Sequence, residues 1–355
     1  MKHQIKTTLR DAWARLLFHT GLFRLVGRLM PRRLTILAGH CVEDRECNGD
    51  LPADMKLSED KLRDLLGFLG RHFDLCTVGQ GLRRLAGTEP GVRSMVALSM
   101  DDGYKDNHRT LMPLLEAIGA SATVFLESRA LDERLVNWSH KYFWLLCSMD
   151  ATAVARGMMA ASTDEDMHTR LESTLLAGGD LAYRVKRVLK YDVDASARNS
   201  ALDALFETHG GDERALCDQL YMTWADAREL QGRGFELGGH TVRHDVLSTL
   251  TPQAARAEIM GGRDALKREL GQKALFSFAY PFGRHWDYDQ AAMDGVEAAG
   301  FELAVTTHAG VVTPGSDKMR LPRLMLDEET PLHLLVAEAC GGFELLRRFG
   351  LNLSE

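Results

Sequence analysis

The sequence predicts an α/β protein built on a closed barrel of parallel strands. Short apolar runs alternate with helix-period stretches along most of the 355 residues, the pattern of a parallel sheet with helical crossovers. Eight runs have strand character, a number that suits a barrel: Thr35–Gly39, Asp74–Val78, Met95–Met100, Ala122–Leu126, Phe235–Gly239, Phe276–Tyr280, Leu303–Thr307 and Leu321–Leu326. Helical stretches fall between many of them: Glu59–Arg71, Arg109–Ile118, Pro252–Leu270 and Tyr288–Ala299. Barrel enzymes carry their chemistry on loops after the carboxyl ends of the strands, where several polar residues of this chain lie.

The third run ends in two adjacent acids. In Ser94–Tyr104 a mostly apolar stretch leads directly into Asp101, Asp102, a glycine and a tyrosine. Adjacent carboxylates repel each other, and burying either without a partner costs free energy. A bound cation would resolve this conflict, with one acid ligating the metal and the other acting on a water. The structural alternative is a helix N-cap, because Asp-Gly after a strand also begins turns and helices.

The fifth run is followed by a histidine pair. His240 and His244 are four residues apart, which predicts two imidazoles on one helical face within reach of one cation. Gly238 and Gly239 directly before the pair allow close backbone approach. The alternative is a surface helix that happens to carry two histidines. With Asp102 the pair would form a three-ligand set that leaves coordination positions open, as catalytic sites do.

Three motifs resemble those of the polysaccharide deacetylase family (NodB homology, carbohydrate esterase family 4). They are Met100-Asp-Asp-Gly-Tyr104, His240-Thr-Val-Arg-His244 and Phe278-Ala-Tyr-Pro-Phe-Gly283, and the resemblance extends from about Leu34 to Asp327 with one long insertion. It implies a distorted (β/α) barrel of seven to eight strands and a divalent metal that hydrolyses N-acetyl groups on sugars. The aromatic-Pro-aromatic-Gly form of the third motif resembles the subgroup that acts on exopolysaccharide glucosamine.

The resemblance also assigns roles by position. Asp101 resembles the catalytic base, and Asp102, His240 and His244 resemble the metal ligands. The backbone N–H of Phe282 resembles the oxyanion donor. Zinc is the expected metal, and cobalt, nickel or iron also suit two imidazoles and a carboxylate.

The sequence departs from the family pattern at two places. Ala279 stands where many members carry an arginine that orients the base, and Arg323 in the last run could replace it by pairing with Asp101. Asp327, directly after the last run, stands where the family usually has a catalytic histidine. His308 and His40, each after a strand-like run, are therefore the two candidates for the general acid. Tyr280 and Arg323 are expected substrate contacts.

Composition excludes several other classes of protein. The chain is 45% hydrophobic, which suffices for a large core. A net charge of -7 and the lack of a basic stripe with aromatics argue against nucleic acid as a partner. Six cysteines in so long a chain do not form a disulfide scaffold.

The first 33 residues differ in charge from the rest. Eight Lys and Arg against the single acid Asp11 give this segment a net charge of +7 and leave -14 for the remainder. Apolar residues recur at three- and four-residue steps, as on an amphipathic helix: Leu9, Trp13, Leu16, Leu17, Phe23, Val26, Leu29 and Met30. One interpretation is peripheral contact with an anionic membrane, and the slightly favoured one is a helix packed against the barrel with its arginines in solvent.

The barrel domain is expected over residues 34–355, interrupted by a helical insertion at about 137–222. Met167–Leu176 and Leu181–Leu189 have long helix-period patterns there, and the stretch contains no proline. Because it follows the fourth run, it should emerge on the active-site face as a lid, a partner surface or an addition to stability.

Together these features predict a metal-dependent de-N-acetylase that acts on an amino sugar of a polysaccharide or glycolipid. The alternatives are an O-acetyl esterase or another amide hydrolase on the same site, and a non-catalytic carbohydrate-binding barrel. No export signal or membrane span is recognisable, so the expected location is the cytoplasm, with the inner face of the membrane as the alternative.

Overall fold

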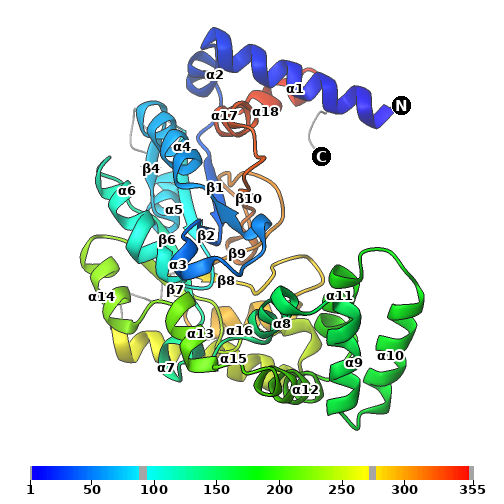
Figure 1. Cartoon of the computed structure of the whole chain (residues 1–355). Helices are drawn as coiled ribbons and strands as arrows, with labels where there is room; N and C mark the ends of the chain where they lie inside the picture. The colour runs from blue at the N-terminus through cyan, green and yellow to red at the C-terminus, as the bar shows by residue number, and fades with distance from the viewer. Residues whose placement is uncertain (1, 88–93, 272–276, 352–355) are drawn as a thin grey trace.

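The computed structural model describes residues 2–87, 94–271 and 277–351, in which strands and helices alternate as the sequence predicts (Figure 1). The strands are β1 (Leu34–Gly39), β2 (Cys41–Val42), β3 (Lys56–Leu57), β4 (Asp74–Cys76), β5 (Met95–Met100), β6 (Thr123–Leu126), β7 (Glu236–Gly239), β8 (Ser277–Ala279), β9 (Leu303–Val305) and β10 (Leu324–Met325). Helices outside the insertion are α1 (Lys2–Thr20), α2 (Phe23–Leu29), α3 (Arg45–Asn48), α4 (Glu59–His72), α5 (Val78–Ala86), α6 (Met112–Glu116), α7 (Ser128–Asp132), α14 (Trp224–Gly232), α15 (Pro252–Leu270), α16 (Gln290–Ala298), α17 (Leu332–Cys340) and α18 (Gly342–Arg348). Each of the eight predicted runs contains a strand of the main sheet, although Phe276 lies outside the described residues.

The main sheet is parallel and curls into a barrel. Its strands follow the order β10-β1-β5-β6-β7-β8-β9, and β4 pairs with β5 beside this path. Both β4 and β6 pair with β5, the former along Met95–Ala97 and the latter along Ser99–Met100. A parallel bridge from Val305 to Leu321 joins β9 to the segment that leads into β10, so the curled sheet returns to its first strand. The predicted (β/α) barrel of seven to eight strands is confirmed, and its distortion comes from the forked pairing of β5.

Two glycines in β7 allow the barrel interior to close. A Cβ on Gly238 would lie 2.6 Å from the Phe125 ring and 2.7 Å from the Ser277 carbonyl oxygen, and one on Gly239 would lie 2.8 Å from the Phe301 ring. No side chain fits at these distances, so the close backbone approach expected from the sequence is present. This approach sets the position of the histidine pair that follows β7.

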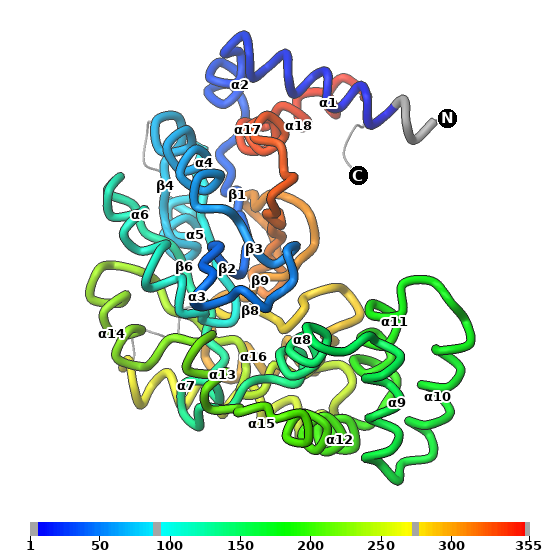
Figure 2. The backbone as a smooth tube through the Cα atoms, in the orientation of Figure 1, coloured from blue at the N-terminus to red at the C-terminus, as the bar shows by residue number. Residues whose placement is uncertain are grey.

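The N-terminal segment forms two helices, because the chain turns at Gly21, whose φ is +73°. Figures 1 and 2 place α1 and α2 at one end of the molecule beside α17 and α18. Leu17 is buried, and the Trp13 Nε1–H donates to the Gly342 carbonyl oxygen over 3.1 Å. The single apolar stripe that the sequence predicts is therefore divided: one side packs on the C-terminal helices, and Leu9, Leu16 and Leu29 are exposed.

Six helices occupy the predicted insertion between β6 and β7. They are α8 (Trp138–Ser148), α9 (Ala151–Ala161), α10 (Glu165–Leu176), α11 (Leu181–Tyr191), α12 (Ala195–Thr208) and α13 (Glu213–Leu220). Asp side chains cap the N-termini of α9 to α13, which explains why the helices begin where they do. Figure 1 shows α9 and α10 projecting from the side of the barrel. Within the described part of the chain, no helix has the length and apolar character that a membrane crossing requires.

Candidate metal centre and active site

Asp102, His240 and His244 converge at the carboxyl ends of β5 and β7. The Asp102 Oδ1 atom lies 3.3 Å from the Nε2 atom of His240 and 3.3 Å from that of His244. All three side chains are buried, and their ligand atoms lie within 4.8 Å of one another. Barrel strands deliver their last residues to one end, which is how positions far apart in the sequence come together.

The donor set fits a divalent cation. The His240 Nδ1 atom lies 2.7 Å from the Ala279 carbonyl oxygen and donates its proton there, so in the neutral ring Nε2 carries a lone pair. The Asp102 Oδ1 atom is buried and has no hydrogen-bond donor among the described residues. A carboxylate oxygen and two imidazole nitrogens that face one another with lone pairs repel unless a cation lies between them. The cluster is therefore a possible metal site.

The histidine pair is not helical, contrary to the expectation from its four-residue spacing. His240–His244 forms a loop after β7 in which Thr241 and His244 have φ of +65° and +59°. These left-handed residues curl the loop so that both rings face Asp102. The prediction failed because a three-residue gap fits this tight loop as well as a helical turn, and the spacing alone does not distinguish the two.

Backbone strain is concentrated at the site. In the described part of the chain, five residues other than glycine have positive φ, and four of them surround the cluster: Asp102, Thr241, His244 and Phe282. Left-handed backbone costs such residues on the order of 1–3 kcal/mol each and persists where the surroundings impose it. Strain of this kind typically accompanies function.

Asp101 lies beside the cluster and is held by Arg323. The Arg323 Nη1–H donates to Oδ1 of Asp101 over 2.7 Å, and the Nη2–H donates to Oδ2 over 2.8 Å. Both side chains are buried, at 0% and 5% exposure. Burial alone would raise the pKa of Asp101, but the Arg323 guanidinium outweighs it and holds this pKa below its ordinary value. The ion pair between Arg323 and Asp101, expected from the sequence in place of an arginine at position 279, is therefore present.

Arg323 and Tyr280 differ from the substrate contacts that the sequence suggested. Arg323 also donates from Nε to the Thr306 carbonyl oxygen and from Nη1 to the Ser99 hydroxyl, so its guanidinium is engaged within the protein. Tyr280 is buried, stacks on Tyr288 at 4.3 Å between ring centroids and donates to the Met319 carbonyl oxygen. Both residues are therefore part of the framework around the site.

The remaining candidates differ in their position relative to the cluster. Phe282 packs its ring on His244 at 4.7 Å between centroids, and its backbone N–H donates to no protein group in the described part of the chain. His40, half-buried after β1, is close enough to Asp101 and Asp102 to influence the pKa of both. His308 instead neighbours His285 and Arg320, and its buried Nε2 atom has no partner among the described residues.

Sequence reasoning missed a buried polar network next to Asp102. The Tyr104 hydroxyl donates to Nε2 of His140 over 2.7 Å, and the Tyr221 hydroxyl donates to Oε2 of Glu127 over 3.2 Å. Burial raises the pKa of Glu127 to about 8 and lowers that of His140 to about 4. An acid directly after β6, at the carboxyl end of a barrel strand, was the available signal. His140 and Tyr221 come from the insertion and its end, so nothing local indicated them.

The insertion is attached to the loops of the second and third motifs. Lys190 on α11 forms an ion pair with buried Asp287 at 3.1 Å, and its Nζ atom lies 3.4 Å from the centroid of the Phe282 ring. Arg198 on α12 pairs with Asp245, next to His244, at 2.8 Å. Burial lowers the pKa of Lys190 to about 8. The insertion therefore contacts the chain segments that follow β7 and β8.

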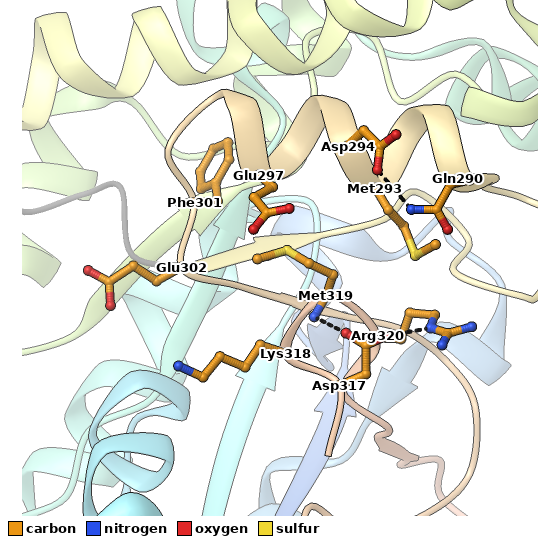
Figure 3. Close-up of a pocket in the computed structure, with 10 residues that line it drawn as sticks. All are labelled: Gln290, Met293, Asp294, Glu297, Phe301, Glu302, Asp317, Lys318, Met319 and Arg320. Atoms are coloured by element: carbon orange, nitrogen blue, oxygen red, sulfur yellow. Dashed lines mark hydrogen bonds and ion pairs between the residues drawn. The ribbon is translucent and has the colours of Figure 1, made fainter. Parts of the chain in front are cut away.

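A separate cavity lies on the outer side of the barrel. It has a volume of about 470 Å³ and lies between α16 and the 3-10 turn η5 (Lys318–Arg320), as Figure 3 shows. Asp294 and Asp317 there are hydrogen bonded to Gln290 and Arg320. None of the residues named above as metal or base candidates lines it, so it is distinct from the candidate active site.

A curled parallel barrel with a carboxylate and two imidazoles at the strand ends is what the resemblance to polysaccharide deacetylases implies, and comparisons with known proteins confirm that resemblance. The polysaccharide deacetylase family model matches residues 192–304. A Bacillus subtilis (strain 168) protein named "Putative polysaccharide deacetylase YxkH" is 25% identical over 111 residues, or 31% of this chain. That match spans 38% of the relative's own length.

Solved structures share the fold over most of the chain. The Streptococcus pyogenes deacetylase PplD in complex with acetate superposes with a TM-score of 0.56 at 16% identity, covering 87% of this chain and 99% of that one. IcaB from Ammonifex degensii gives a TM-score of 0.53 at 17% identity, covering 87% and 97%. The BpsB deacetylase domain from Bordetella bronchiseptica gives 0.51 at 16% identity, covering 84% and 97%. At these identities the likeness is one of fold.

Proposed function

We propose that this protein is a metal-dependent hydrolase that removes the N-acetyl group of an amino sugar in a polysaccharide or glycolipid. The observation that carries the proposal is the buried Asp101 carboxylate, paired with Arg323 and adjacent in the chain to the Asp102–His240–His244 cluster. A metal site alone would also serve binding or structure. An ionised carboxylate held beside it supplies the base that hydrolysis needs.

The residues of the chain then divide the work as follows. Asp102, His240 and His244 would hold a divalent cation, which when bound polarises the acetyl carbonyl and lowers the pKa of a water. Arg323 keeps Asp101 ionised and oriented to take the proton from the attacking water. The Phe282 N–H, which has no acceptor within the described part of the chain, would stabilise the developing oxyanion. Zinc suits this ligand set, as do cobalt, nickel and iron.

We assign the general acid to His40 in preference to His308. The leaving amine must be protonated close to the base and the metal ligands, and His40 lies within electrostatic range of Asp101 and Asp102. His308 interacts with a different set of charges, on the η5 side of the barrel.

Metal content and acetate release test the proposal together. The His240→Ala/His244→Ala variant should lose both bound metal and hydrolysis, whereas Asp101→Asn should keep its metal and lose about two to four decades of turnover. Acetate released from a panel of N-acetylated and O-acetylated glycans identifies the bond cleaved. His209→Ala and Asp60→Asn remove the same side-chain types at exposed positions and should change neither readout.

Three results would contradict parts of this proposal. Full metal occupancy in the folded double histidine variant would exclude the assigned ligands. Unchanged turnover by Asp101→Asn would remove the base and favour the carbohydrate-binding alternative. Acetate release from O-acetylated glycans alone would reassign the chemistry to an esterase on the same residues.

A further inference from the structure

A basic groove lies at the opposite end of the barrel from the metal cluster. It has a volume of about 640 Å³ and runs between α2, the end of α4 and the start of β5. Four arginines and a histidine line it together with aromatic rings: Phe23, Arg24, Arg28, Arg32, Arg71, His72 and Phe73. No Asp or Glu lines it among the residues that the structure describes. The groove therefore has the charge of an anion site.

Arg24 and Arg28 carry charge that no described acidic side chain neutralises. They are four residues apart on α2, where like charges destabilise a helix. Neither has an acidic partner within the described part of the chain, and the Arg24 guanidinium lies only over the Phe23 ring, at 5.5 Å. Arginine forks bind phosphate oxygens in pairs, so a phosphate group would satisfy both side chains.

An apolar strip lies next to these arginines on the same short segment. Leu22, Leu25 and Leu29 follow one another at three- and four-residue steps and are 41%, 52% and 68% exposed. Leu9 and Leu16 on α1 are also exposed, so residues 9–29 contribute five of the twelve large apolar side chains exposed in the described part of the chain. A soluble surface rarely concentrates leucines in this way unless something covers them.

We propose that α2 and this groove dock the protein onto an anionic phospholipid surface. Lipid phosphates bind Arg24 and Arg28 in the groove, and Leu25 and Leu29 enter the boundary between headgroups and acyl chains. The +7 charge of residues 1–33 against -14 for the rest orients this end toward the membrane. A free anion would satisfy the arginines but would leave the leucine strip uncovered.

The geometry leaves the active site open in the docked state. Arg32 precedes β1, and Ser94, which also lines the groove, precedes β5, so the groove lies at the amino ends of the strands. The metal cluster lies at their carboxyl ends, a six-residue strand or roughly 20 Å away. Docking at α2 therefore does not depend on hydrolysis, and each proposal can fail without the other.

Vesicle binding by the full-length protein tests the docking. We expect binding to vesicles of phosphatidylcholine mixed with phosphatidylglycerol, none to pure phosphatidylcholine, and progressive loss with salt. Each basic residue near an anionic surface contributes about fivefold in affinity, so Arg24→Gln/Arg28→Gln should bind about 25-fold more weakly. Leu25→Ser/Leu29→Ser should lose about tenfold or more while keeping the salt dependence of the wild type.

The matched control is Arg214→Gln/Arg256→Gln, which removes the same charge from exposed positions on α13 and α15. It should bind within about twofold of the wild type.

An equal loss of vesicle affinity in both arginine variants would refute binding in the groove, and no binding by the wild type at low salt would refute the docking. Inorganic phosphate that binds with no vesicle binding would point to a free anion instead. If Leu25→Ser/Leu29→Ser leaves vesicle binding unchanged and only converts a dimer to a monomer, a second copy of this chain covers the leucine strip. Thermal melts establish that each variant is folded, and the leucine pair tests the idea if the arginine pair unfolds.

Discussion

Replacing Arg323 by methionine should destabilise the protein strongly and in a pH-dependent way. The substitution removes two charge-assisted hydrogen bonds of 2.7 and 2.8 Å and leaves Asp101 as an unpaired carboxylate at 5% exposure. Removing one partner of a buried ion pair typically costs about 3–5 kcal/mol of unfolding free energy. Methionine has a similar volume and no charge, so most of this loss should come from Asp101 and little from a cavity.

The sign of the pH dependence follows from the pKa of Asp101. In the wild type the folded pKa of Asp101 lies below its ordinary value, so its ion pair stabilises the fold above that value and the gain is lost as pH falls through the folded pKa. Without Arg323, burial raises the folded pKa instead, and the variant loses stability as pH rises through the interval above 3.8. The difference between wild type and variant should therefore be small in acid and largest near neutral pH.

Denaturant unfolding at several pH values measures this difference. The unfolding free energy of Arg323→Lys should lie between those of the wild type and Arg323→Met, because one ammonium cannot form the paired bonds. Arg320→Met removes an exposed arginine nearby and should change the unfolding free energy by less than about 1 kcal/mol. Asp101→Asn/Arg323→Met should recover part of the loss, because no buried charge remains. A loss below about 1 kcal/mol in Arg323→Met, equal at all pH values, would refute the reasoning.

Three further predictions concern the surroundings of the site. Gly238→Ala should lower the unfolding free energy by about 2 kcal/mol or more through overpacking, while Gly232→Ala, at an open helix position, should be neutral or stabilising in the same melts. The folded pKa of Lys190 is about 8, against 10.5 ordinarily. The unfolding free energy of the wild type should therefore rise with pH between these two values, relative to that of Lys190→Met. Parallel plots of unfolding free energy against pH for the two proteins would show that this lysine is not buried as described. His40→Ala should reduce turnover by about two decades and His308→Ala by much less, and the reverse order in an acetate-release assay would exchange their roles.

Local patterns in the sequence suffice to predict the barrel and to select the three residues of the candidate metal site that the fold brings together. Strand runs and helix periods are local features, and each strand end delivers its next residues to the same edge of the sheet. That is why the order of residues alone places Asp101 and Asp102 after β5 together with His240 and His244 after β7. The pairing of Arg323 with Asp101 was inferable from position because both lie in the barrel wall.

The support of these residues, and the surfaces far from them, depend on tertiary contacts. Whether His240 and His244 lie on a helix or a loop depends on backbone strain at Thr241 that a four-residue spacing does not encode. Glu127 meets Tyr221 only because the insertion folds back over the barrel, and the Phe23 ring meets His72 at the end of α4 only through the path of the N-terminal helices. Such contacts join segments separated by tens of residues or more, and their free energy depends on burial, which a linear pattern cannot specify for polar side chains.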